Sequence, residues 1–232
     1  MVKRILWLTV AAVLALMPVA ALANQITLGG DGVMTFTSSG ATGSPITLSP
    51  LSASSGNTGG YEAPTGNAII ALQPWSMAFD SAFSFGGLSG GQFSTITNGG
   101  GTAFSWGGNG GGTVTGTINW TLVTDNTQTP RFNGMLLVTG NTVTAADYGG
   151  KGALVLADFV VGNSAALDFT VNLGSKPSLD AVYLHTGGAT TTSGSFSSGE
   201  VVVGEPGTLL FLGAGMVGLG YMARRRLAGR RG

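Results

Sequence analysis

Side chains capable of catalysis are few and widely spaced in this sequence. His185 is the only histidine, and the absence of cysteine excludes disulfides and thiolate metal sites. Glycoside hydrolysis needs two carboxylates held a fixed distance apart, and four aspartates recur at intervals of ten to twelve residues: Asp147, Asp158, Asp168 and Asp180. That spacing matches a strand repeat, so we interpret them as turn or strand-edge residues. The glycine runs lack the Lys-Ser/Thr of a phosphate-binding loop, and no calcium-loop pattern occurs. We predict a non-enzyme without cofactor or metal.

Ligand contact is the chemistry that the residue types favour. Trp106 stands between glycine runs, which predicts a surface loop whose indole could stack on a sugar. Tyr183 and His185 are two residues apart in a segment whose pattern predicts a strand, so they would share one face. These three residues are the predicted ligand contacts.

The segments that position these residues have the pattern of strands and turns. In Thr113–Leu122 apolar residues alternate with threonine and asparagine, which predicts a half-buried antiparallel strand with Trp120 in the core. Phe132–Thr139 is its predicted returning partner. Further strands are predicted at Gly32–Thr37, Ala68–Leu72, Ala78–Phe85, Gln92–Thr97, Leu154–Val161, Ala166–Leu173, Leu179–His185 and Gly199–Val203.

Two segments of this region have special compositions. Leu154–Val161 is apolar apart from Asp158, which predicts a central strand covered on both faces. Ala189–Ser198 is low in complexity, which predicts an exposed loop.

Strands without helical interludes predict an all-β domain, an antiparallel β-sandwich or jelly roll. The alternative is a β-helix, but that fold requires a sequence repeat, and we find none.

The N-terminus has the pattern of a secretory signal peptide. Lys3 and Arg4 precede an apolar stretch from Ile5 to Val19, and Ala21 and Ala23 fit the small-x-small cleavage pattern. We predict a signal peptide over 1–23 and a mature chain that begins near Asn24. An uncleaved signal anchor is the alternative.

A second apolar segment lies near the C-terminus. Residues 208–223 carry no charge and are followed by Arg224, Arg225 and Arg226. As a helix this segment would span roughly 24 Å, slightly less than the ~30 Å hydrocarbon core, a mismatch that thinning and snorkelling can cover. The arginines of the tail, 224–232, predict a cytoplasmic end. The protein would then be anchored in the inner membrane with its bulk outside.

The segment 204–232 resembles the PEP-CTERM sorting signal of Gram-negative bacteria. The matching residues are the motif Glu205, Pro206, Gly207 and Thr208, the apolar helix, and the membrane stop at Arg224, Arg225 and Arg226. Gly204 stands where the family usually has its first proline. The resemblance implies processing by the membrane enzyme exosortase, release to the cell surface or extracellular matrix, and a link to exopolysaccharide. The alternative is an unprocessed C-terminal anchor.

Charge and composition restrict the partners of the exported domain, 24–203. Between Asn24 and Pro206 there are three basic and ten acidic residues, a net charge of −7. Nucleic-acid binding depends on clustered lysine and arginine, so we exclude it. We predict an exported cell-envelope protein with a structural or interaction role, whose partners are the secretion machinery, exosortase and exopolysaccharide. The alternatives are a polysaccharide-acting enzyme and a lectin-like module on the same scaffold.

Overall fold

The computed structural model describes residues 24–203 except 31, 42, 50–56, 64–65 and 126–127. The predicted signal peptide and the predicted sorting segment lie outside the described residues. None of the helices in the described part of the chain combines the length and apolar character that a membrane crossing needs.

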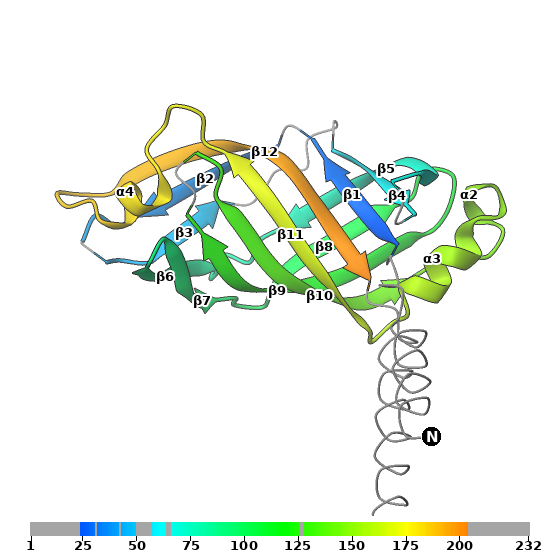
Figure 1. Ribbon diagram of the computed structural model, residues 1–232. Coiled ribbons are helices and arrows are strands. Elements are labelled where there is room, and N and C mark those ends of the chain that lie inside the picture. The colour runs from blue at the N-terminus through cyan, green and yellow to red at the C-terminus, as the bar shows by residue number, and fades with distance from the viewer. Residues whose placement is uncertain are drawn as a thin grey trace, which may run out of the picture. The chain divides into compact units, whose positions relative to one another are not determined.

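The domain is an antiparallel all-β structure, as predicted (Figure 1). Every strand pairing in the described chain is antiparallel, and this rules out a parallel β-helix. The strands are β1 (Gln25–Gly29), β2 (Val33–Ser38), β3 (Ile46–Ser49), β4 (Thr58–Glu62), β5 (Ala68–Ala78), β6 (Ser84–Ser89), β7 (Gln92–Thr97), β8 (Thr102–Gly107), β9 (Thr113–Thr124), β10 (Arg131–Asn141), β11 (Ser164–Asn172) and β12 (Thr190–Val203).

The sheet closes on itself because two long strands change partners along their length. The first part of β12 pairs with β2 and its last part with β1, while β11 occupies its other edge. In the same way β9 pairs first with β8 and then with β7, opposite β10. Strands β9–β12 are therefore shared by two closed circuits, one completed by β1, β4, β5 and β8 and the other by β2, β3, β6 and β7. Closure pairs the strand edges that would otherwise be exposed.

The predicted alternation of β9 is confirmed over most of its length. Val114, Ile118 and Trp120 are buried, and β10 returns beside it as predicted. A register shift leaves Thr121 without a partner in β10, so Val123 is buried rather than Leu122, which was predicted for the core face. A bulge of one residue moves every later side chain to the other face.

The core is dominated by aromatic rings. Phe132 and Phe169 stack at a centroid distance of 4.7 Å, and Trp120 meets Phe169 edge to face at 5.1 Å. The buried indoles have their N–H groups satisfied: Trp75 donates to the Gly29 carbonyl at 2.8 Å. Trp120, predicted as core, donates to Thr102 Oγ1 at 2.8 Å. Satisfied indole donors allow these large rings to be buried without an unpaired polar group.

In the described part of the chain three short helices interrupt the strands, so two strand predictions are wrong. Helix α2 (Asp147–Gly150) and α3 (Gly152–Asp158) precede β11, where Leu154–Val161 was predicted as a central strand. Helix α4 (Leu179–Tyr183) replaces the strand predicted over Leu179–His185. A short apolar run does not distinguish a strand from a helix. Leucine and alanine favour the helix in α3, where burial falls on Val155 and Phe159, four residues apart.

Two other predicted boundaries are corrected by pairing. The loop predicted over Ala189–Ser198 is mostly the first part of β12, where Thr190–Ser195 pairs with β2 on one edge and the chain from Ser195 onward pairs with β11 on the other. Ladder hydrogen bonds, first to β2 and then to β11, compensate for the weak strand propensity of serine and glycine. The strand predicted over Ala78–Phe85 is instead the end of β5, a turn and the start of β6, since Asp80 Oδ1 accepts from the Ala82 amide at 2.7 Å.

Candidate functional site

Trp106, predicted as a surface aromatic in a loop, is fully buried in β8. It lies opposite Trp75 of β5 and Val114 of β9, and its indole donates to the Gly59 carbonyl at 2.9 Å. Flanking glycines suggested a loop, but at Gly59 an added Cβ would lie 3.3 Å from the Trp106 ring, so small residues here make room for the indole. Trp106 therefore cannot contact a ligand directly.

Tyr183 and His185 do not share a strand face, contrary to the prediction. Tyr183 is the last residue of α4; its ring packs edge to face on Phe93, and its hydroxyl accepts from the Gly87 amide at 3.1 Å. His185 is exposed beyond the helix. The strand prediction placed both residues on one face of a pleat, whereas α4 ends at Tyr183 and His185 follows outside the helix.

Tyr148 is the aromatic residue that reaches the surface beside Trp106. Their ring centroids are 5.8 Å apart, and Tyr148 is half-buried. Among the described residues other than glycine it alone has a left-handed backbone, with φ 53° and ψ 38°. This conformation is unfavourable for a bulky residue and persists only where surrounding contacts impose it. Tyr148 is therefore held in this backbone conformation at a cost in conformational free energy.

Those contacts come from the glycine-rich loop between β8 and β9. The Tyr148 hydroxyl donates to the Gly112 carbonyl and accepts from the Gly108 amide at 3.4 Å, while the Tyr148 amide donates to the Gly110 carbonyl at 3.3 Å. Side chains on this loop would collide with the ring, because a Cβ on Gly111 would lie 2.8 Å from it. Burial raises the pKa of Tyr148, so the hydroxyl is a neutral donor at physiological pH.

Asp147 fixes the other side of the same loop. Its Oδ2 accepts from the Thr144 amide at 2.7 Å and from the Gly112 amide at 3.0 Å. Hydrogen bonds from these two amides lower the pKa of Asp147, which keeps the carboxylate ionised as an acceptor. Asp147 is thus a structural residue, consistent with the interpretation of the spaced aspartates as turn residues.

A shallow, open hollow of about 370 Å³ lies beside Tyr148. Its lining includes Ile69, Gln73, Asn109, Tyr148 and Lys151. The buried Gln73 accepts from the Asn109 amide at 3.1 Å, which fixes the rim of the hollow, and the Lys151 ammonium donates to the Ile69 carbonyl. One aromatic ring with amide and ammonium groups around an open hollow can bind a polar ligand that has an apolar face.

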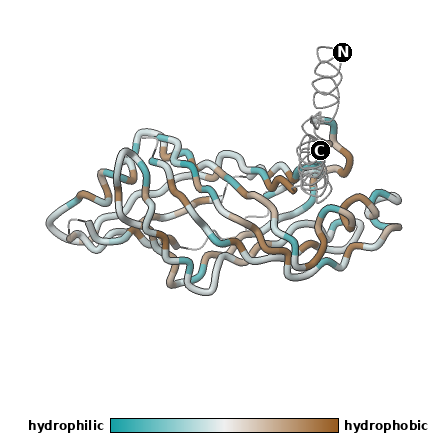
Figure 2. Tube along the Cα trace, turned by 60° about the horizontal axis from the view of Figure 1, so that its bottom comes forward, coloured by the Kyte–Doolittle hydropathy of each residue, from teal (hydrophilic) through white to brown (hydrophobic). Residues whose placement is uncertain are grey.

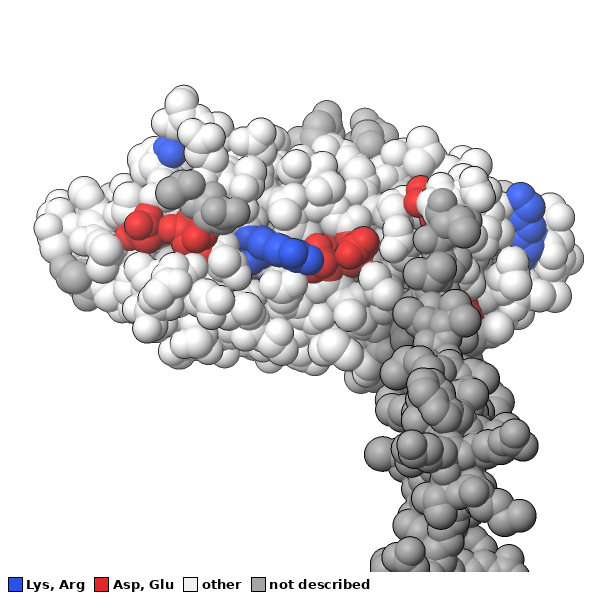
Figure 3. Space-filling view, in the orientation of Figure 1, with Lys and Arg blue, Asp and Glu red and all other residues white. Residues whose placement is uncertain are grey.

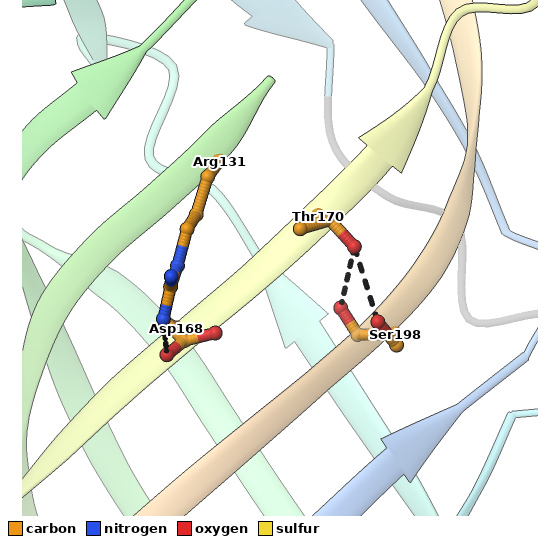
Figure 4. A network of polar contacts seen from close by, with 4 residues as sticks. All are labelled: Arg131, Asp168, Thr170 and Ser198. Atoms are coloured by element: carbon orange, nitrogen blue, oxygen red, sulfur yellow. Dashed lines mark hydrogen bonds and ion pairs between the residues drawn. The ribbon is translucent and has the colours of Figure 1, made fainter. Parts of the chain in front are cut away.

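The remaining spaced aspartates form separate contacts. Asp158 accepts from Tyr61 and from Asn24 Nδ2, the latter at 2.8 Å. Figure 4 shows Arg131 of β10 paired with Asp168 of β11, at 2.5 Å, beside a second cross-strand contact between Thr170 and Ser198, whose hydroxyls are 3.1 Å apart. Asp168 lies directly opposite Glu200 of β12, so Arg131 offsets the repulsion of two acids, and the Asp168 carboxylate raises the pKa of Arg131. On the face in Figure 3 several charged side chains form a narrow band across the middle, a few others lie outside it, and most of the rest is uncharged.

Asp125 and Asp180 form a carboxyl pair that the sequence did not reveal. Asp125 Oδ2 accepts from the Asp180 amide at 3.1 Å, and Asp125 Oδ1 is buried without a hydrogen-bond partner. Burial, reinforced by the Asp180 charge, raises the pKa of Asp125, whereas the Ser178 hydroxyl lowers the pKa of Asp180. The two residues are far apart in sequence and meet only where the end of β9 approaches α4.

The sequence also contains one motif with the spacing of a catalytic serine turn. Gly87-Leu88-Ser89-Gly90-Gly91 has the Gly-x-Ser-x-Gly spacing of a nucleophile elbow. It forms the hairpin between β6 and β7, and a nucleophile elbow requires a strand followed by a helix. Within the described ranges no group of three metal-ligating side chains occurs.

The chain was compared with known proteins at three levels. No family model, no curated protein and no solved structure matches it. The sorting motif at 205–208, the arginines at 224–226 and the cleavage residues Ala21 and Ala23 all lie outside the described residues.

Proposed function

We propose that this chain is exported across the inner membrane, sorted by exosortase, and acts at the cell surface or in the extracellular matrix as a structural or interaction protein linked to exopolysaccharide. The two ends of the sequence support export and sorting. In this proposal residues 24–203 are the exported module, a β-sandwich or jelly-roll-like scaffold without catalytic activity.

The hollow beside Tyr148 is the proposed place of contact with the polysaccharide. The observation that carries this assignment is the left-handed backbone of Tyr148, because strain of this kind gathers at ligand sites. Its ring offers an apolar face for a sugar, and Asn109 and Lys151 supply polar groups at the rim. In the lectin-like alternative, Tyr148 therefore takes the place of Trp106 as the aromatic residue that contacts the sugar.

The mass of the mature protein tests the sorting proposal. The protein would be recovered from the envelope and the medium of its own host, with and without exosortase. A form that begins near Asn24, ends near Glu205 and occurs only with exosortase is the expected result. Retention of Arg224 to Gly232 in both strains would leave the unprocessed anchor.

Substitution of Tyr148 tests the contact proposal. Purified host exopolysaccharide is the probe, and we expect Tyr148→Ala to weaken its binding about tenfold or more. Asn109→Ala removes a rim group whose side chain holds no part of the loop, and we expect a several-fold loss. Tyr183→Ala, a half-buried tyrosine at α4, is the matched control. Equal binding by all variants would refute the assignment, provided that circular dichroism shows the Tyr148→Ala domain folded.

A second candidate function rests on the Asp125–Asp180 pair. A carboxyl with a raised pKa beside one with a lowered pKa can supply a general acid and a general base. If the chain is such an enzyme, incubation with host exopolysaccharide releases reducing ends, and Asp125→Asn abolishes the release. No release by the unaltered protein eliminates this candidate.

A further inference from the structure

Among the described residues, α3 and the turn after it leave four large apolar side chains exposed. Leu154 is 45% exposed, Leu156 36%, Val160 45% and Val161 56%; we call these four residues the α3 patch. The one charged side chain among them, Asp158, turns inward to Tyr61 and Asn24. A helix that is apolar on all sides is normally buried on all sides, yet this one buries only its inner side. Large exposed apolar side chains that lie together mark an interaction surface.

The α3 patch lies next to both ends of the exported domain. The Val203 amide donates to the Asn24 carbonyl at 3.4 Å, so the first and last described residues are neighbours. Asn24 in turn donates to Asp158 at 2.8 Å, which ties them to the end of α3. In Figure 1, α3 lies at the right-hand end of the domain, with the ends of β12 and β1 close by, and Figure 2 has brown, hydrophobic stretches at this end. The apolar surface therefore adjoins the point where the chain leaves toward its tail.

The length of the connection limits how far this end can be from a membrane. In the proposed function the membrane helix begins at Thr208, five residues after Val203. A fully extended chain spans at most ~3.6 Å per residue, so the connection reaches about 18 Å. As long as the tail is inserted, the end of the domain that carries α3 is held close to the bilayer surface.

We infer that the α3 patch rests in the outer interface of the inner membrane while the C-terminal helix is inserted, and so orients the sorting motif toward the membrane. This inference depends on the proposed membrane anchor. Exposed leucine and valine side chains of a short surface helix and of the turn after it insert readily at the boundary of headgroups and acyl chains. The partner is a lipid surface, and release of the tail would free the patch.

Single-cysteine labelling can test this inference on the full chain, because the natural sequence contains no cysteine. Leu154→Cys and Val161→Cys would each carry an environment-sensitive fluorophore, and the anchored protein would be reconstituted in phosphatidylethanolamine–phosphatidylglycerol vesicles with or without nitroxide-labelled lipid. Leu184→Cys is the matched control, because Leu184 is 52% exposed at the end of α4. We expect nitroxide lipid to reduce emission about twofold at the α3 patch and to leave the control unchanged.

Every other outcome contradicts the inference in a recognisable way. Protein that floats with the vesicles but is quenched at no position keeps the anchor and eliminates the α3 contact. Equal quenching at all three positions means non-specific adsorption. A blue-shifted emission at the α3 patch without lipid quenching means that a second copy covers it. Failure to float eliminates the proposed anchor and, with it, the inference that depends on it.

Discussion

At the scale of single residues, side chains act here mainly by holding backbone in place. Tyr148 and Asp147 together bind the amides and carbonyls of the loop between β8 and β9, and the strained Tyr148 is the result. The same arrangement turns the Tyr148 ring into a cover over Trp106. The buried Trp106 ring thus packs against the strained Tyr148, and the Tyr148 ring is the one that reaches the surface.

The Asp125–Asp180 pair predicts a stability that depends on pH. Folding raises the pKa of Asp125 above its ordinary value of 3.8. The folded state then binds this proton more tightly than the unfolded chain, so Asp125 reduces stability as pH rises from that value through the raised one. We expect Asp125→Asn to be more stable than the natural protein at neutral pH, by at most about 1 kcal/mol, since the pair is partly open to solvent.

Urea unfolding at neutral pH and well below pH 3.8 measures this difference, which should vanish at the lower pH. Asp180→Asn is the opposing control, because hydrogen bonding from Ser178 lowers the pKa of Asp180 and its carboxylate favours folding at neutral pH. A destabilised Asp125→Asn variant at neutral pH would show that Asp125 is held as a carboxylate.

At the scale of elements, glycine decides how closely β9 and β10 approach. A Cβ on Gly116 would lie 2.5 Å from the Leu137 carbonyl oxygen and 2.5 Å from Leu136 Cδ1. A Cβ on Gly134 would meet the Trp120 ring at 2.7 Å, close to the bulge in this pair. The two glycines allow the register that places Ile118 and Trp120 in the core.

Gly116→Ala should therefore destabilise the domain by about 1–3 kcal/mol, the usual cost of overpacking. Gly29→Ala is the matched control, since a Cβ there would meet only the Thr58 carbonyl at an ordinary 3.5 Å; we expect a change within about 0.5 kcal/mol. Equilibrium denaturation of the two variants gives the comparison. Equal stability of both would mean that β10 moves away without cost.

At the scale of the whole molecule, the two closed circuits share one core. Phe36 of β2 belongs to one circuit and stacks on Phe132 of the shared β10 at 5.9 Å. Trp75 and Trp106 belong to the other circuit, on β5 and β8. Since β9–β12 are common to both circuits, a substitution that destabilises one circuit should also destabilise the other.

Phe36→Ala tests this coupling. Removing the ring should cost about 3–5 kcal/mol, and tryptophan fluorescence should report the same lowered midpoint as far-UV circular dichroism. The natural protein, measured by both probes, is the control. A fluorescence midpoint that stays unchanged while the dichroism midpoint falls would show that the circuits unfold independently.

The sequence alone determined those features that depend on local pattern. Alternation identified β9, β10 and β7, the last with its bounds Gln92–Thr97, and it placed Trp120 in the core. The absence of cysteine and the acidic charge of residues 24–206 are properties of the composition. The signal peptide and the sorting tail are likewise assigned from local pattern, and they stay predictions.

Only the tertiary structure decided which apolar and polar segments are covered. Trp106 is buried because β5 and β9 flank it, and 190–198 is strand because its first part pairs with β2 and its last part with β11. Leu154 and Leu156 are as apolar as core residues, yet α3 leaves them outside. Asp125 meets Asp180 across 55 residues. A pattern records which residues share a face, but burial depends on partners that are distant in sequence.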